Sequence, residues 1–392
     1  MRIHILGIGP IGSLLSFHLR RELPPSIPIH LFHRTQRNAL DITANGGFIS
    51  VERAGVILSA DGFKAEVLDT NKLVKQNPIE SEPVESLFVT VKSHHTLSAI
   101  KAILPRISSN ATIVLLQNGM GVYEQLVHDV FRNPELRPHF ILASSTHGAW
   151  FKGFHNVVHS RMGTIKFGIV PDPAGRQFEA NLSNQSLPPW DRKLRLDDIH
   201  DPSNNPDPRY RSLRNTVAAL CSLNNPLSTS WIPMEEIQLI MRRKLVVSAV
   251  IDSITALMNC RNGDIFTTAA SYRLMNRLCQ EASDVFSRQL QSDTKAWLES
   301  LDDPSENATS IRVPYLLTAK ALQDECIREA QLTKGNISPM LVDIRSGKST
   351  EVDFVNGYLL NLGSTYKVPM PAMATMLNLV KMRCDIPLDQ AL

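Results

Sequence analysis

A short apolar run followed by three closely spaced glycines opens the chain, and it restricts the possible folds more than any other stretch. Residues 1–12 read MRIHILGIGPIG. The run 2–7 contains β-branched residues and predicts a buried strand. Gly7, Gly9 and Gly12 then have the spacing G-x-G-x-x-G, and a helix is predicted over 10–21. This order of strand, loop and helix is typical of a dinucleotide-binding turn.

Each glycine of such a loop has a physical task. The first permits a tight turn, the second lets the backbone approach a pyrophosphate, and the third lets the helix pack close to the strand. The N-terminal N–H groups and the dipole of the helix attract phosphate. A plain strand-turn-helix is the alternative. We predict that the cofactor contacts Gly7, Ile8, Gly9, Pro10, Ile11 and Gly12.

The end of the second strand indicates which dinucleotide is bound. The predicted strand 27–32 is followed by His33 and Arg34, with Arg37 close behind. An NAD site usually has Asp or Glu here to bind the ribose 2′-hydroxyl, and this chain has no carboxylate at that point. A guanidinium suits a 2′-phosphate instead. We therefore expect NADPH rather than NADH, with a solvated loop arginine as the alternative for Arg34.

Composition excludes several classes of function. The 392 residues are enough for two or three domains. With 41 basic and 38 acidic residues the net charge is +3, which gives no electrostatic case for nucleic acid. No apolar run is long enough to cross a membrane, and no cluster of metal ligands is visible. The five cysteines lack C-x-x-C spacing and are expected to be free thiols.

The compartment and the oligomeric state are less restricted. Because the first predicted strand begins at residue 2, we expect no cleaved leader and a cytoplasmic protein, with a mitochondrial location as the alternative. A homodimer is compatible with the sequence.

The pattern of elements predicts two domains. Strands alternate with helices over 1–170, and further strands are expected at 87–91, 112–117, 140–145 and 164–170. Such runs are typical of a doubly wound, Rossmann-type parallel sheet. The stretch 171–211 is rich in Pro, Asn, Asp and Ser, so we expect a disordered or loosely held insertion. We place the α/β domain at 1–234 and an all-α domain at 235–392.

Two polar residues follow predicted strands of the sheet. Lys92 comes after strand 87–91, and Asn118 comes after strand 112–117. Ligands of doubly wound sheets lie beyond the carboxyl ends of the strands, so both are candidate binding residues. A surface lysine and a turn residue before glycine are the respective alternatives.

The predicted helix 234–258 carries a polar stripe. Lys244, Ser248 and Asp252 are spaced i, i+4, i+8 and share one face of an otherwise mostly apolar helix. A desolvated lysine on such a face can act as a proton donor. The alternative is a lysine that extends to the surface beside a carboxylate. Glu351 begins another predicted helix, 351–361, where the helix dipole favours it in any case.

Six stretches in order resemble the ketopantoate reductase (2-dehydropantoate 2-reductase) family. They span nearly the whole chain, and the insertion at 171–211 lies outside the match. The long insertion and the helical additions resemble a fungal or other eukaryotic form. The stretches are GIGPIG at 7–12, VTVKSH at 89–94, LLQNGMG at 115–121, STHGA at 145–149, RRKLVVSAVIDSITALMNCRNGDI at 242–265 and NISPMLVDIRSGKSTEVDFVNGYL at 336–359.

The resemblance implies an enzyme that reduces the ketone of 2-dehydropantoate to pantoate with NADPH, for pantothenate and coenzyme A synthesis. It implies three catalytic residues: Lys244 as the general acid, Glu351, which holds the substrate hydroxyl, and Asn118 in the cleft between the domains. Asn118 would also contact the cofactor. The resemblance also implies a 2′-phosphate contact for Arg34 and a cofactor-side position for Lys92.

The chain departs from the family pattern at three positions. Ser248 and Asp252 stand where asparagines are usual, and Pro339 stands where a serine is usual, with Ser338 one place earlier. A reductase of another 2-oxo acid and a non-catalytic dinucleotide-binding member therefore remain as alternatives. The substrate-binding residues that we predict are Asn118, Lys244, Ser248, Asp252, Ser338 and Glu351.

Overall fold

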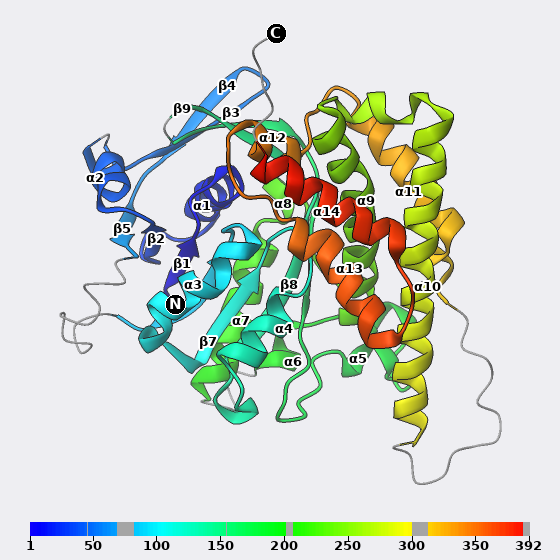
Figure 1. Ribbon diagram of the computed structural model, residues 1–392. Coiled ribbons are helices and arrows are strands. Elements are labelled where there is room, and N and C mark those ends of the chain that lie inside the picture. Colours follow the sequence, from blue (N-terminus) through cyan, green and yellow to red (C-terminus); the bar gives the residue numbers. More distant parts are fainter. Residues whose placement is uncertain (45, 69–81, 154, 201–206, 300–312, 387–392) are drawn as a thin grey trace. The chain divides into compact units, whose positions relative to one another are not determined.

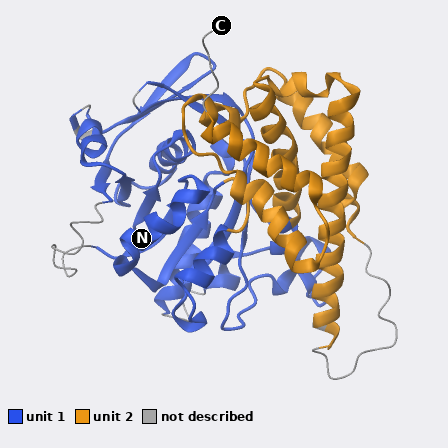
Figure 2. Ribbon diagram, viewed as in Figure 1, with its two compact units in different colours: residues 1–117, 122–238 blue, residues 118–121, 239–392 orange. Residues whose placement is uncertain are grey.

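The computed structural model describes residues 1–392 apart from 45, 69–81, 154, 201–206, 300–312 and 387–392. It divides into two compact units, which Figure 2 shows in different colours. Unit 1 comprises residues 1–117 and 122–238, and unit 2 comprises residues 118–121 and 239–392. The division falls four residues after the expected boundary at 234, and the short segment 118–121 belongs to the second unit.

An eight-stranded sheet forms the centre of unit 1, in the order β12-β11-β8-β7-β6-β1-β2-β5. All neighbours are parallel except β8 and β11, which are antiparallel. The predicted doubly wound α/β sheet is confirmed, although the strand expected at 164–170 runs against β8. The strands are β1 (Ile3–Leu6), β2 (Ile29–His33), β5 (Phe63–Val67), β6 (Val84–Val89), β7 (Ile107–Leu115), β8 (His139–Ser145), β11 (Ile165–Ile169) and β12 (Thr229–Trp231).

A second, four-stranded sheet in unit 1 has the order β4-β3-β10-β9. Its strands are β3 (Ile49–Arg53), β4 (Val56–Ala60), β9 (Gly148–Gly153) and β10 (Asn156–Arg161). Helix α1 (Pro10–Glu22) contacts both β1 of the large sheet and the strands of the small sheet (Figure 1). Its side chains Leu14, Phe17 and Leu19 are buried for that reason. The small sheet therefore lies against the helix that follows the glycine loop.

The remaining helices of unit 1 are mostly short, and α7 packs on β6 and β7 of the large sheet. They are α2 (Gln36–Ala44), α3 (Ser93–Ile103), α4 (Val122–Asp129), α5 (Ala180–Ser183), α6 (Leu196–Ile199), α7 (Pro208–Ser222) and α8 (Asn224–Leu227), with 3-10 turns η1 (Leu104–Arg106), η2 (Pro134–Leu136) and η3 (Pro189–Asp191).

The insertion at 171–211 packs against unit 1, so the expectation of a loosely held segment is wrong for its described part, which excludes 201–206. Phe178 and Ile199 are buried in the core of unit 1. The buried Asp172 accepts a hydrogen bond of 2.6 Å from the Tyr210 hydroxyl and pairs with Arg209 at 3.4 Å. Composition alone could not predict this packing, because only two apolar side chains and one buried ion pair hold an otherwise polar segment.

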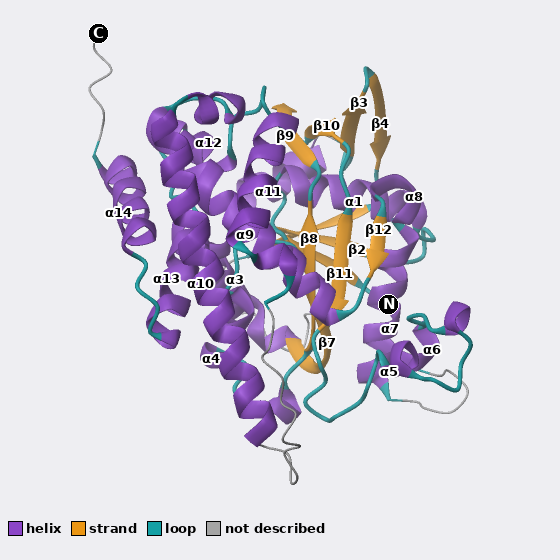
Figure 3. Cartoon of the chain, turned by 90° about the vertical axis from the view of Figure 1, so that its right-hand side faces the viewer, coloured by secondary structure: helices purple, strands orange, loops and turns teal. Residues whose placement is uncertain are grey.

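Unit 2 is all-helical, as predicted, and Figure 3 shows its helices joined by loops. Helices α9, α10, α11 and α13 contribute most of its apolar core. The buried Glu281 of α10 accepts the N–H groups of Ala372 and Met373 at 3.0 and 2.9 Å, which fixes the start of α14. The helices are α9 (Met234–Met258), α10 (Ala269–Glu299), α11 (Ala319–Leu332), α12 (Pro339–Arg345), α13 (Val352–Tyr366) and α14 (Pro371–Asp385), with η4 (Asn262–Thr267) and η5 (Tyr315–Leu317).

All twelve histidines of the sequence precede residue 201, in unit 1. Burial, followed by the charge of His30, lowers the pKa of His4 from 6.5 to about 3. Burial, followed by the charge of Arg209, lowers the pKa of His139 to about 4. The folded state keeps both rings neutral, whereas the unfolded chain protonates them near pH 6.5. Their contribution to stability is therefore present above that pH and is lost as the pH falls towards the folded-state values.

We expect unit 1 to lose stability before unit 2 on acidification from pH 7 to 5. Each buried histidine that stays neutral lowers the free energy of unfolding by about 1.4 kcal/mol per pH unit below its unfolded pKa. Hydrogen exchange measured by mass spectrometry would follow peptides of both units. A His139→Gln variant should show a shallower pH dependence. Equal loss of protection in both units would contradict the expectation.

Candidate functional site

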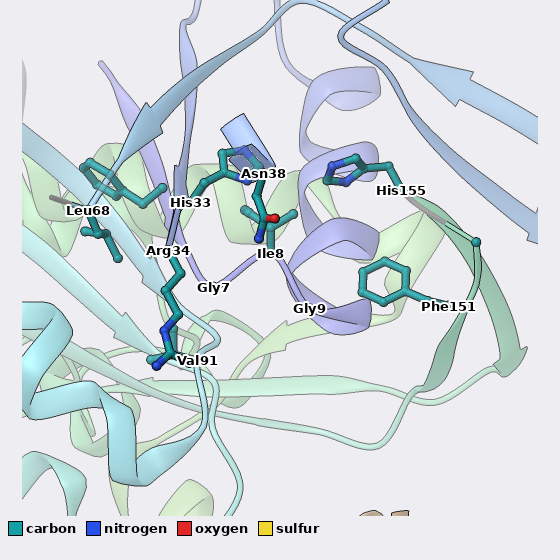
Figure 4. A pocket seen from close by; sticks show the side chains of 12 residues that line it. Gly7, Ile8, Gly9, His33, Arg34, Asn38, Leu68, Val91, Phe151 and His155 are labelled. Atoms are coloured by element: carbon teal, nitrogen blue, oxygen red, sulfur yellow. The ribbon is translucent and has the colours of Figure 1, made fainter. Parts of the chain in front are cut away.

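A cavity of about 400 Å³ lies at the glycine loop of unit 1 (Figure 4). Its walls come from the loop after β1, the end of β2, the start of α2 and the β9–β10 hairpin. A concave site of this volume can hold a small ligand. The lining residues are Gly7, Ile8, Gly9, Phe32, His33, Arg34, Asn38, Leu68, Val91, Phe151, Gly153 and His155.

The three glycines of the loop differ in the physical reason that a side chain is absent. Gly7 has φ 109°, and a Cβ there would lie 2.5 Å from the backbone nitrogen of Val91. A Cβ on Gly12 would lie 2.0 Å from the carbonyl oxygen of Gly7. A Cβ on Gly9 would meet no described atom within 4 Å. Packing of the protein thus explains Gly7 and Gly12, while open space above Gly9 fits the approach of a pyrophosphate.

The first turn of α1 presents backbone N–H groups at this loop. Gly9 is the N-cap and Pro10 is the first helical residue, with Ile11 next. No described side chain caps the helix, and its first turn contains no acidic residue. The Thr90 hydroxyl donates a hydrogen bond of 2.6 Å to the Gly7 carbonyl and so holds the loop in place. The helix terminus is therefore suited to an anion.

The end of β2 supplies a cation to the cavity. The exposed Arg34 lines the cavity, and so does Asn38 in the first turn of α2. Arg37 does not line it, and its guanidinium lies 3.9 Å from the Asp41 carboxylate. None of the described residues that line the cavity is Asp or Glu. No carboxylate of the described lining is therefore present to bind a ribose 2′-hydroxyl, whereas the guanidinium of Arg34 suits a 2′-phosphate.

Five of the predicted cofactor residues lie outside the lining of this cavity: Pro10, Ile11, Gly12, Lys92 and Asn118. Lys92 is the half-buried N-cap of α3, directly after the lining residue Val91. Asn118 belongs to unit 2. Of the predicted cofactor residues, the cavity brings together Gly7, Ile8, Gly9 and Arg34.

A second constellation lies in unit 2. Lys244, Ser248 and Asp252 are half-buried on one face of α9, between positions that face the apolar core. The Lys244 Nζ atom donates a hydrogen bond of 3.0 Å to Oδ1 of Asn118. Two of the predicted catalytic residues, 126 positions apart in sequence, are therefore in direct contact.

Helix α13 holds the segment that carries Asn118. The Met120 N–H donates to the carbonyl oxygen of Phe354 at 2.9 Å. Gly119 has φ 81°, and a Cβ there would lie 2.5 Å from the same oxygen. Only glycine suits this close approach. Glu351, which is 7% exposed, is the N-cap of this same helix. The third predicted catalytic residue thus begins the helix that positions Asn118.

Ser338 has a structural task in unit 2. It is the N-cap of α12, and its hydroxyl oxygen accepts the Leu341 N–H at 3.2 Å. The Thr255 hydroxyl lies 2.6 Å from it, and Ser338 is 1% exposed. Pro339 occupies the first helical position, where its missing N–H costs nothing. The predicted contact of Ser338 with substrate stays a prediction.

His4, His30 and Glu66 form the one group of described residues with metal-like spacing, their ligand atoms lying within 4.8 Å of one another. The Arg106 guanidinium already pairs with Glu66, and its charge would repel a cation there. Burial raises the pKa of Glu66, but hydrogen bonds from His30 and Arg106 outweigh it and lower the pKa to about 2. We interpret the group as an ion-pair network that joins β1, β2 and β5.

Sequence reasoning missed Phe151 on β9 and His155 in the turn before β10, because the β9–β10 hairpin was not predicted. In the described part of the chain, no helix combines the length and apolar character needed to cross a membrane.

Comparisons with known proteins cover both units. The family model described as "Ketopantoate reductase PanE/ApbA" matches residues 3–172, and its counterpart "Ketopantoate reductase PanE/ApbA C terminal" matches residues 236–383. A 2-dehydropantoate 2-reductase of Saccharomyces cerevisiae is 23% identical and covers 92% of this chain and 87% of its own. One from Bacillus subtilis is 26% identical and covers 93% and 91%.

Solved structures share the fold. A D-mandelate dehydrogenase bound to NADH and anilino(oxo)acetate has a TM-score of 0.69 at 15% identity, over 98% of each chain. A PanE/ApbA family ketopantoate reductase from Ralstonia eutropha has a TM-score of 0.65 at 18% identity, over 98% of this chain and 99% of its own. With the two family models spanning most of its length, the chain belongs to the ketopantoate reductase family of nicotinamide-dependent oxidoreductases.

Proposed function

We propose that the protein reduces 2-dehydropantoate to pantoate with NADPH, as a step towards pantothenate and coenzyme A. The observation that carries the proposal is the 3.0 Å hydrogen bond between Lys244 and Asn118 within a chain of this family. The name of the yeast relative supports the substrate. A cytoplasmic location is part of the same proposal, and cell fractionation tests it.

The cofactor would be held by the cavity of unit 1. The backbone around Gly9 and the first turn of α1 would bind the pyrophosphate, and Arg34 would bind the 2′-phosphate. We assign Lys92, which follows β6 and begins α3, a contact on the cofactor side as well. A bound NADPH supplies the hydride for the ketone carbon.

Lys244 is the proposed general acid. Reduction of a ketone develops negative charge on its oxygen, and an ammonium group can both stabilise that charge and release a proton to it. The Asn118 amide oxygen accepts one N–H of Lys244 and so helps to orient the ammonium group. Glu351 would accept a hydrogen bond from the substrate hydroxyl. Ser248 and Asp252, on the same face of α9, would contact the remainder of the substrate.

Replacing Arg34 with glutamine tests the choice of cofactor. We expect the Kd for NADPH to rise by about 10–100-fold, because a charge-assisted contact to phosphate contributes roughly 1.5–3 kcal/mol. The Kd for NADH should change little. Fluorescence titration of both cofactors measures this. Arg37→Gln is the matched control, since Arg37 lies outside the cavity lining and is exposed. Equal weakening of NADPH and NADH would contradict the assignment.

Reduction of a different 2-oxo acid is the second candidate function. Asp252 brings a carboxylate to the same helix face as Lys244, and Ser248 has a shorter side chain than the usual asparagine. Both changes alter the surroundings that a branched, hydroxylated substrate would meet. A non-catalytic family member is a weaker candidate, because a scaffold does not require the contact between Lys244 and Asn118.

A further inference from the structure

The β9–β10 hairpin contributes a residue in an unusual backbone conformation to the cavity. His155 has φ 52°, lies in the turn before β10 and is 9% exposed. Side chains with a Cβ rarely adopt this left-handed region, and residues that do so gather at ligand-binding sites. Glycine would be the residue of least strain here. The presence of a buried histidine therefore needs a reason.

His33 at the end of β2 is the neighbour of His155. The two rings are 6.0 Å apart between centroids, in an edge-to-face arrangement. His33 is 4% exposed and lines the same cavity, and its Nε2 atom has no hydrogen-bond partner among the described residues. A buried ring nitrogen without a partner is costly unless a ligand satisfies it.

We propose that His33 and His155 complete the binding site for the 2′-phosphate of NADP(H), together with Arg34 and Asn38, which line the same cavity. The inference rests on the proposed NADPH cofactor and adds two residues of this chain to its recognition. Figure 4 shows the rings of His33 and His155 and the amide of Asn38 on the same side of the glycine loop. Imidazole N–H groups there would donate hydrogen bonds to a phosphate oxygen, as Arg34 would.

Burial lowers the pKa of both rings, and a bound anion would oppose that effect. Burial, followed by the charge of His155, lowers the pKa of His33 to about 4. Burial also lowers the pKa of His155, while the Asp41 carboxylate on α2 acts in the opposite direction. A phosphate dianion would raise both values. Binding of a 2′-phosphate should therefore take up protons near pH 6.5, and binding of a nucleotide without one should not.

Isothermal titration calorimetry with adenosine 2′,5′-bisphosphate and with AMP tests the proposal, since these probes differ only in the 2′-phosphate. For His155→Gly we expect binding of the bisphosphate to weaken about tenfold, the loss of one charge-assisted hydrogen bond. AMP binding should be unchanged. The thermal stability of the variant should be equal or higher, because glycine relieves the strained φ. Titrations of His155→Gly with the bisphosphate, in buffers of different ionisation enthalpy, should show that the variant takes up fewer protons on binding than the unmodified protein does.

Matched variants separate strain from recognition. Ala54→Gly relieves a similar φ of 49° in the β3–β4 hairpin, outside the cavity lining, and should leave both affinities unchanged. His33→Gln should weaken the bisphosphate alone. If His155→Gly and His33→Gln bind the bisphosphate as tightly as the unmodified protein, the histidines are structural and the inference fails while NADPH use stands. If the unmodified protein binds both probes equally, NADPH use fails and the inference fails with it.

Discussion

Replacing Lys244 with methionine should lower kcat for 2-oxo acid reduction by about 10²–10⁴-fold, the usual contribution of general acid catalysis. Methionine keeps much of the aliphatic volume on the half-buried face of α9 but removes the proton donor. The Kd for NADPH should change little, because the glycine loop and Arg34 lie in the other unit. Steady-state kinetics and a cofactor titration measure the two effects separately.

The partner of Lys244 provides a second variant. Asn118→Ala removes the acceptor 3.0 Å from the ammonium group and should lower kcat by a smaller factor. If the two residues act together, the double variant should be no slower than Lys244→Met alone. Lys320→Met is the control, because Lys320 is exposed on α11 and pairs with Asp324 at 2.8 Å. Retained turnover in Lys244→Met, or equal loss in Lys320→Met, would exclude Lys244 as the acid.

Gly9→Ala should raise the Kd for NADPH by about 100-fold, roughly 2.7 kcal/mol, without lowering the melting temperature. A Cβ at this position meets no described atom of the protein, so folding has no reason to suffer. The methyl group would occupy the space through which a pyrophosphate approaches the backbone. Calorimetry with NADPH and a thermal unfolding scan measure the two quantities.

Variants of two further glycines serve as controls for Gly9→Ala. Gly12→Ala should destabilise the protein by about 3 kcal/mol or more, because its Cβ would lie 2.0 Å from the Gly7 carbonyl oxygen. Gly335→Ala, at an equally open position in unit 2, should change neither stability nor NADPH binding. Unchanged NADPH affinity in Gly9→Ala would mean that the pyrophosphate does not bind at this loop.

Much of the fold and the glycine loop could be predicted because their signals are local. Buried parallel strands give continuous apolar runs, and the spacing of Gly7, Gly9 and Gly12 predicts the loop. The stripe on α9 follows from helical periodicity alone, which placed Lys244, Ser248 and Asp252 on one face. These features depend on a few adjacent residues, so one sequence is sufficient to find them.

Features made by pairing of distant segments could not be predicted. The small sheet joins β3 to β10 across about a hundred residues, and its edge strand β4 exposes Val56, Ile57 and Leu58 in succession. That pattern lacks the alternation by which a half-buried strand is found. The sequence therefore could not predict that His155 lines the cavity. The contact of Lys244 with Asn118 likewise depends on the docking of residues 118–121 on α13, which no local pattern encodes.

The most direct test of the proposed function is the oxidation of NADPH by the purified protein, with 2-dehydropantoate compared against a panel of other 2-oxo acids. We predict that kcat/KM for 2-dehydropantoate exceeds that for each other acid, and that NADPH is used in preference to NADH. Preferential turnover of another acid would show that Ser248, Asp252 and Pro339 have changed the substrate. NADPH binding without turnover of any acid would contradict the account of Lys244 as a catalytic acid.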